Sequence, residues 1–305
     1  MKTLIGSMLV VASGFVAHGQ QPVPVTTNMD VNDLASATVT VRAVAGLPAF
    51  PRLPVMLEIT VSNPTNRDLI LPMPTLSDRE NPWNTLDIVY SRGGLPEARV
   101  SHLVPVFGAW KEGLEPPFAT LARFAPKSQW VTRVPLSYDW LSGSPAPIIE
   151  AGSIQIRASL CATVRDVKGN LKVDRSRSKD SQPLTISVAP AAGADAAAVA
   201  ELLKTTSPWA ISAPESGDYL SISSHLEPFE SFATRYASSA YGPYAKALLA
   251  HLHMSTRAPG SRLPSPDSVS RALTLLDEAT ASPHFVLARD AEQLRAKAQT
   301  MRVKQ

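Results

Sequence analysis

The chain has 305 residues, among them 27 prolines and a single cysteine, and a formal net charge of +3. A lone cysteine excludes an intramolecular disulfide framework, and proline at this frequency excludes a mostly helical chain, because proline breaks helix interiors. The small net charge does not indicate a nucleic-acid-binding protein, and the length suits two modest domains stabilised by apolar cores.

The first 19 residues have the three parts of a secretory signal peptide. Lys2 supplies a positive charge, residues 4–17 are apolar, and Ala17-His18-Gly19 places small residues where signal peptidase cleaves. The apolar run is shorter than the roughly 20 residues that span a bilayer, and no later stretch approaches that length. We therefore expect cleavage after Gly19 and a periplasmic or secreted protein without a membrane span.

Residues 20–36 are polar and predict a disordered leader, whereas residues 37–190 alternate between apolar and polar side chains, as strands with one buried face do. In the clearest strand, Leu57 and Ile59 share one face and Glu58 lies on the other. Turn sequences separate the strands, which indicates an antiparallel sandwich. The expected strands are 38–44, 55–62, 69–71, 85–90, 99–107, 129–137, 153–164, 170–173 and 184–188.

A basic stretch surrounds Gly169-Asn170, a dipeptide typical of hairpin turns. We predict a solvated hairpin tip, and the alternative is a contact surface for an anionic partner. Because no aromatic side chain lies in the stretch, stacking on nucleic-acid bases is not expected. The basic residues are Arg165, Lys168, Lys172, Arg175, Arg177 and Lys179.

Three pieces of residues 38–190 resemble the immunoglobulin-like β-sandwich domains of secreted bacterial proteins. They are Leu57-Glu58-Ile59-Thr60-Val61-Ser62-Asn63-Pro64-Thr65-Asn66, Phe124-Ala125-Pro126-Lys127-Ser128 and Glu150-Ala151-Gly152-Ser153-Ile154. Such domains usually have glycine where Lys127 stands and tyrosine where Ile154 stands. The resemblance implies the fold of this domain and says little about function, because these pieces are turns.

After residue 190 the period of the apolar residues changes from two to that of a helix. Residues 191–223 predict a linker that contains a short helix from Asp195 to Lys204, and residues 224–305 predict four helices that form two hairpins. Each of the four starts at a capping or proline signal. These signals are Ser224-His225-Leu226-Glu227, Gly242-Pro243, Ser265-Pro266 and Ser282-Pro283.

Residues 224–302 are similar to the tetratricopeptide-like repeats of bacterial envelope proteins, notably in Tyr241-Gly242-Pro243-Tyr244-Ala245-Lys246-Ala247-Leu248-Leu249-Ala250. Three or more repeats are normally needed for independent stability, so two hairpins should lean on the sandwich, the 195–204 helix or a partner. The expected fold class is thus α+β, with an antiparallel immunoglobulin-like sandwich followed by a small tetratricopeptide-like helical domain.

Four aromatic residues, Phe232, Tyr236, Tyr241 and Tyr244, surround the turn that joins the first two helices of this domain. They either fill the core of the hairpin or line a groove beside it. We expect Tyr236 and Tyr244 to lie mostly in the core. Tyr241, in the turn, should be exposed and available to anchor a partner.

Four tryptophans lie between residues 83 and 140, namely Trp83, Trp110, Trp130 and Trp140. Trp83 and Trp110 stand in long polar loops, and in a row they would form a stacking platform for sugar rings. The alternative is that the tryptophans cover the ends of the sandwich and the domain junction.

No motif for phosphate, dinucleotide or metalloprotease chemistry occurs in the chain. His251 and His253 point about 200° apart on a helix, so they should not share a metal ion. The carboxylates within residues 78–80 and 112–115 read as solvated loop residues, and Cys161 reads as a small buried side chain. We therefore expect no catalytic residue, metal site or cofactor.

The leading hypothesis is an exported, non-catalytic interaction or scaffold protein that binds a protein or peptide partner through its helical hairpins. The first alternative is a carbohydrate-binding sandwich that uses Trp83 and Trp110. A hydrolase whose site is assembled from unrelated loops and a purely structural envelope component are the others. Exposed apolar side chains on the helices would favour the first hypothesis, and a deep pocket with two titratable groups would favour the hydrolase.

Overall fold

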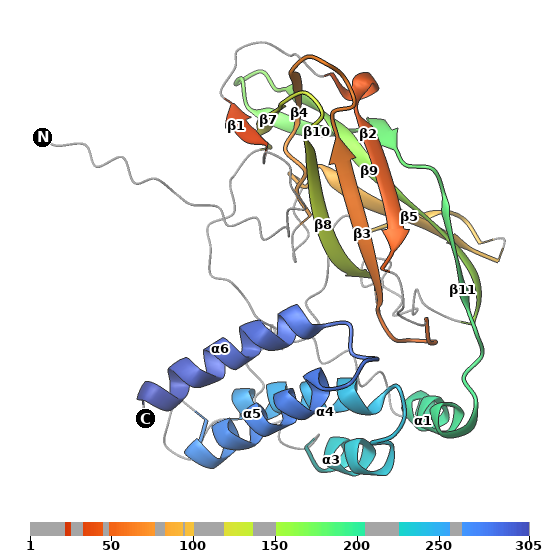
Figure 1. Ribbon diagram of the computed structural model, residues 1–305, viewed down its shortest axis with the longest axis vertical. Helices are drawn as coiled ribbons and strands as arrows, with labels where there is room; N and C mark the ends of the chain where they lie inside the picture. The colour runs from red at the N-terminus through yellow and green to blue at the C-terminus, as the bar shows by residue number, and fades with distance from the viewer. Residues whose placement is uncertain are drawn as a thin grey trace, which may run out of the picture.

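The computed structural model describes residues 22–25, 33–44, 49–76, 83–93, 95–100, 119–136, 151–204, 226–256 and 264–304. Within them the chain is an α+β protein with five α-helices and three antiparallel sheets (Figure 1). We call the described part of residues 22–188 the β-region and that of residues 193–304 the helical region. Figure 1 shows the β-region stacked on the helical region, with α1 directly after the last strand.

The three sheets of the β-region enclose one apolar core. One sheet has the order β2 (Thr38–Ala43), β3 (Val55–Ser62) and β8 (Gln129–Leu136). The largest has the order β10 (Leu171–Asp180), β9 (Gly152–Arg165), β5 (Leu86–Arg92) and β6 (Ala98–Val100), and β11 (Leu184–Val188) pairs with β9. The third has the order β1 (Val23–Val25), β7 (Leu121–Phe124) and β4 (Leu69–Pro72).

Strand β3 confirms the facing that the sequence predicts. Leu57, Ile59 and Val61 have no exposed surface, while Met56 and Thr60 on the opposite face are half-buried. Successive side chains of a strand point to opposite faces, so the three apolar residues enter the core together. They supply the centre of the core beneath the β2-β3-β8 sheet.

Glu58, on the outer face of β3, is not freely solvated as its parity suggests. The register places it between Arg42 of β2 and Arg133 of β8. Arg42 Nε donates to Glu58 Oε1 at 2.7 Å, and Arg133 Nε donates to Oε2 at 3.1 Å. Burial acts to raise the pKa of Glu58, but the hydrogen bonds from the two arginines outweigh it and hold the pKa below its usual value.

The turn before β8 holds a non-glycine residue in a left-handed conformation. Lys127 has a φ of 59°, in the left-handed region that costs a non-glycine residue about 1 kcal/mol. Its Nζ donates to Pro64 O at 2.5 Å, and Asn63 Nδ2 donates to Phe124 O at 2.9 Å. These bonds join two turns that are distant in sequence and hold Lys127 in place.

Three parts of the β-region differ from the predicted elements. Residues 23–25 and 34–36 of the expected disordered leader form β1 and the 3-10 helix η1 (Leu34–Ser36), because β1 pairs with the edge of β7. Strand β7 is not among the predicted strands. Strand β10 is longer than expected because it continues past a register shift.

The five helices are α1 (Gly193–Lys204), α3 (Leu226–Arg235), α4 (Gly242–Ser255), α5 (Pro266–Thr280) and α6 (Ala288–Lys304). From α3 to α6 each helix packs against the next, as the predicted hairpins require. The predicted starts of α4 and α5 are confirmed, with proline in the first turn of each and the Ser265 side chain accepting a bond from Ser268 N. None of the described helices is long and apolar enough to cross a membrane.

Helix α6 starts at Ala288 and not at the predicted Ser282-Pro283. Tyr244 explains the difference, because its hydroxyl donates to His284 O at 2.9 Å and accepts from Val286 N at 3.1 Å. These bonds hold the backbone outside a helical path. The preceding segment still buries Phe285 against the Tyr244 ring, with ring centroids 5.1 Å apart.

The β2–β3 loop connects the two regions. Leu53 lies in the core of the helical region, Phe50 contacts His284 edge-to-face with ring centroids 5.8 Å apart, and Pro51 O accepts a 2.6 Å bond from the Tyr241 hydroxyl. Helix α1 also docks, since Asp195 Oδ1 accepts from Ala240 N at 2.8 Å. The helical hairpins therefore lean on both the β-region and the 195–204 helix.

Candidate functional site

Most of the four aromatic residues predicted to bind a partner are buried in the core of the helical region. Phe232, Tyr241 and Tyr244 are buried, and Tyr236 is half-buried against the Phe232 ring at a centroid distance of 4.8 Å. The expectation for Tyr244 is confirmed. The expectation that Tyr241 is exposed is wrong, because none of its surface is accessible.

Tyr241 points inward because of the turn in which it stands. Ser239 N donates to Tyr236 O at 3.0 Å and Gly242 N donates to Ser239 O at 3.2 Å, so the chain doubles back tightly before α4. A Cβ atom on Gly242 would come within 2.6 Å of Tyr236 O, which shows how closely the backbone approaches itself. The Tyr241 side chain is thereby directed at the β2–β3 loop, where Pro51 O satisfies its hydroxyl.

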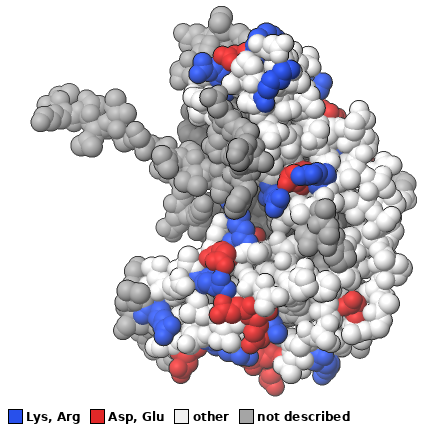
Figure 2. All heavy atoms as spheres, viewed as in Figure 1, with Lys and Arg blue, Asp and Glu red and all other residues white. Residues whose placement is uncertain are grey.

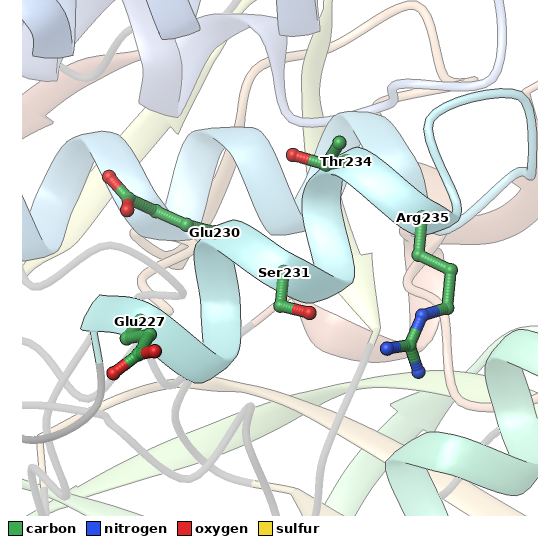
Figure 3. Close-up of a pocket in the computed structure, with 5 residues that line it drawn as sticks. All are labelled: Glu227, Glu230, Ser231, Thr234 and Arg235. Carbon is green, nitrogen blue, oxygen red and sulfur yellow. The ribbon is translucent and has the colours of Figure 1, made fainter.

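The structure offers a different surface on the exposed face of α3. An open hollow of about 440 Å³ is lined by five polar side chains of this one helix (Figure 3). They repeat every three to four residues, opposite the buried Phe229, Phe232 and Ala233. The same spacing could have identified this face in the sequence. The five residues, which we call the α3 face, are Glu227, Glu230, Ser231, Thr234 and Arg235.

The α3 face is acidic at its start. Glu227 and Glu230 occupy that part, and Arg235 at the other end forms an ion pair with Glu201 of α1, with Nη1 and Oε1 3.6 Å apart. His253 Nε2 lies 3.6 Å from Glu230 Oε1. Burial lowers the pKa of His253 although Glu230 opposes this, so His253 is neutral at pH 7 and leaves the Glu230 charge in place.

On the face of the helical region seen in Figure 2, the charges are mixed in sign. Figure 2 shows acidic and basic side chains interspersed over the viewed face of the helical region, with no broad field of one sign. This agrees with the small net charge of the chain. The acidic start of the α3 face is therefore a local feature.

The two histidines and the cysteine that the sequence offers as candidate metal ligands or nucleophile lie in surroundings that do not suit those roles. His251 is buried in α4, while His253 faces α3, so the two rings diverge as their spacing predicts. Burial raises the pKa of Cys161 to about 12, so its thiol is protonated and not nucleophilic. In the part of the chain that the structure describes, no three His, Cys, Asp or Glu residues could hold a metal ion together.

Of the tryptophans, Trp83 is half-buried in a turn and Trp130 packs at the edge of the β-region core. Trp110 and Trp140 lie outside the described residues, as do the carboxylates within 78–80 and 112–115. The predicted sugar-stacking platform of Trp83 and Trp110 stays a prediction.

Comparison with models of known protein families gives no match. Comparison with functionally characterised proteins gives none either. One solved structure found to be similar is a GH3 beta-glucosidase of Bifidobacterium adolescentis, at 10% sequence identity and a TM-score of 0.22. The match covers 50% of this chain and 17% of that enzyme, and a likeness at this level carries no argument for fold or function.

Proposed function

We propose that this chain is an exported, non-catalytic scaffold protein in which an immunoglobulin-like sandwich presents a tetratricopeptide-like helical unit to a protein or peptide partner. The signal-peptide pattern of residues 1–19 supports export. The observation that carries the proposed binding role is the hollow on the α3 face.

The α3 face suits a peptide segment better than a small molecule. It is open, and the described residues that line it all belong to one helix, which differs from the enclosed, mostly apolar lining of a small-molecule pocket. Ser231 and Thr234 provide hydroxyls that can both donate and accept hydrogen bonds, as a peptide backbone requires. Glu227 and Glu230 favour a segment that carries lysine or arginine.

The junction between the two regions supports a scaffold role. Leu53 and the Tyr241–Pro51 bond fix the β2–β3 loop in the helical core. Helix α1 holds the turn before α4 through Asp195 and Ala240. A partner on the α3 face would therefore be held in a defined orientation relative to the β-region.

Site-specific photo-crosslinking in cells tests the proposal. A photoreactive amino acid at Ser231, on the α3 face, should give a discrete cross-linked product with a protein partner. The matched control is Ser270, an exposed serine of α5, which should give none. The double substitution Glu227→Lys/Glu230→Lys should abolish the Ser231 product. Equal products at both serines, or a product that survives charge reversal, would contradict binding at this face.

A further inference from the structure

The outer face of the β10-β9-β5-β6 sheet contains a fully buried carboxylate. Asp87 of β5 has no exposed surface, and its side chain lies on the face of the sheet opposite the apolar core. Its Oδ2 atom accepts three hydrogen bonds, while its Oδ1 atom has no partner among the described residues. A buried acceptor left unpaired costs about 1–3 kcal/mol, so stability alone does not explain this arrangement.

Two arginines from opposite sides of β5 share the same oxygen of Asp87. Arg99 of the neighbouring β6 donates from Nη1 at 2.6 Å. Arg175 of β10 reaches across β9 and donates from Nε at 3.2 Å. One carboxylate thus holds two like-charged guanidinium groups together, which would otherwise repel each other.

A bulge in β10 delivers Arg175 to this place. Asp174 pairs with Ala162 and Ser178 with Cys161, so residues 175–177 are extra on the β10 side. Asp174 fixes the bulge, because its Oδ1 accepts from Ser176 N at 3.1 Å and its Oδ2 accepts from Arg177 Nε at 2.8 Å. Bulges of this kind redirect side chains and are common beside functional sites.

Both arginines have guanidinium N–H groups that donate to none of the described residues. Each guanidinium has five N–H groups. Among the described residues Arg99 uses only Nη1, and Arg175 uses Nε for Asp87 and Nη2 for Asn84 O at 3.2 Å. Their side chains are 38% and 32% exposed, whereas the side chain of Asp87 has no exposed surface.

Arg99, Arg175 and Asp87, which are in direct contact, carry an excess of one positive charge, and the adjacent Arg157, Glu97 and Asp180 carry an excess of one negative charge. Cys161, which donates to Asp87 Oδ2 at 3.4 Å, stays neutral. The nearby Arg157 has its own carboxylate in Glu97, which it contacts at 2.7 Å, and Asp180 lies 3.6 Å from the same guanidinium. Asp180 acts on Arg99 only through the longer-range field. The pair Arg99 and Arg175 therefore shares one counter-charge in direct contact, Asp87, while Asp180 acts on Arg99 from a longer distance.

We propose that Arg99 and Arg175, positioned by Asp87, bind an oxyanion, the carboxylate or phosphate group of a ligand, on the outer face of this sheet. Guanidinium groups match both oxyanions because they donate paired, charge-assisted hydrogen bonds. Asp87 acts as a positioning residue, since its burial keeps it away from the ligand. Arg175 belongs to the basic stretch for which an anionic contact surface is the alternative to a solvated hairpin tip.

Nuclear magnetic resonance titration of the purified protein tests this inference. The arginine Nε–Hε signals of Arg99 and Arg175 are followed while inorganic phosphate or acetate is added, with sodium chloride at matched ionic strength as the reference. Both signals should shift and saturate at millimolar concentration with phosphate, acetate or both, and not with chloride. The anion that saturates the shifts at the lower concentration is the oxyanion that the site prefers.

Variants separate this site from general surface attraction. Arg175→Gln should weaken the oxyanion affinity about tenfold or more, because half of the donor pair is lost. Arg133→Gln is the matched control, since Arg133 also shares a carboxylate with a second arginine, and it should leave the affinity unchanged. Arg99→Gln should weaken the affinity in the same way, and if it fails to fold, Arg99→Lys, which keeps the charge but not the paired donors, should also weaken it. Equal effects of Arg133→Gln and Arg175→Gln, or chloride shifts equal to those of the oxyanions, overturn the proposal.

Discussion

Glu58 and Asp87 have similar positions in two sheets of the β-region, yet their hydrogen bonding differs. Each lies on the outer face of an inner strand and is contacted by an arginine on either side. Glu58 gives one oxygen to Arg42 and the other to Arg133, and both arginines are mostly exposed. Asp87 gives one oxygen to both arginines and to Cys161, and its second oxygen is buried without a partner in the described chain.

The difference separates a satisfied cross-strand contact from a partly satisfied one. In the first, every group of the carboxylate is paired and the arginines project into water, so the contact adds modestly to stability. In the second, the protein keeps two cations near each other around a buried anion at an energetic cost. Such a cost is typical of sites that bind something.

Of the two carboxylates, Asp87 should contribute much more to stability than Glu58. Asp87→Ala leaves Arg99 and Arg175 without their counter-charge, and we expect a loss of about 3–5 kcal/mol in the free energy of unfolding. Glu58→Ala, with its exposed arginines, should cost about 1 kcal/mol or less. Urea unfolding measures both. Equal losses would mean that the two carboxylates contribute alike.

The inner and outer faces of β3 should contribute very differently to the free energy of unfolding. Leu57→Ala and Ile59→Ala remove fully buried side chains and should each cost roughly 2–5 kcal/mol. Glu58 stands between them and points outward, so Glu58→Ala should cost far less in the same urea experiment. Comparable losses for Glu58 and Ile59 would show that the ion pairs of Glu58 matter as much as core packing.

His251 extends the comparison to the helical region, because its ring Nδ1 is also buried without a partner in the described chain. Burial, reinforced by Lys297 of α6, lowers the pKa of His251 from 6.5 to about 4, while Ser255 Oγ lies 3.4 Å from Nε2. The unfolded chain therefore binds a proton more readily than the folded one between these values. Stability should fall as the pH drops from 6.5 towards 4, by on the order of 3 kcal/mol at the lower end.

The variant His251→Leu removes this titrating group and should flatten the dependence of the urea midpoint on pH in that window. An unchanged slope in the variant would assign the acid sensitivity to other groups. Carboxylates such as Glu58, whose pKa is lowered from 4.5, lose their contribution from about that pH down through their folded pKa, so they overlap only the acidic end of this window.

The smallest effect is expected for a polar group that is fully satisfied. Tyr241→Phe keeps the buried ring and removes only its bond to Pro51 O, so it should cost about 1 kcal/mol. Tyr241→Ala should cost about 3–5 kcal/mol, because it also empties the core at the junction. Thermal unfolding of both variants checks this order. A stable Tyr241→Ala protein would mean that the turn can exist without the ring.

Local features of the fold could be predicted because local residues cause them. Alternation identified the buried face of β3. Proline and serine marked the starts of α4 and α5. By contrast, β1 pairs with β7, a partner that is remote in the sequence, so no local signal reveals it.

The sites could not be predicted because their partners are remote in the sequence. Tyr241 was expected in the solvent since its turn is polar, but its partner Pro51 is 190 residues away. The alternation of side chains along a strand could not predict that Asp87 and Arg175 come together. Arg175 reaches Asp87 only because of a bulge in β10, and it does so across β9. The stripe on α3 was readable from its spacing, although its accessibility depends on how the helices pack.

The insertion of the β2–β3 loop into the helical region means that the covalent connection after β11 is not what keeps the two regions together. The Ala, Pro and Gly content of residues 189–222 predicts that a protease cuts there first. With Phe50, Pro51 and Leu53 still seated against Tyr241 and His284, the two fragments should co-elute after such a cut and separate only in denaturant. By the same reasoning, a helical fragment produced alone should be rescued by a peptide that carries the loop sequence, as in fragment complementation.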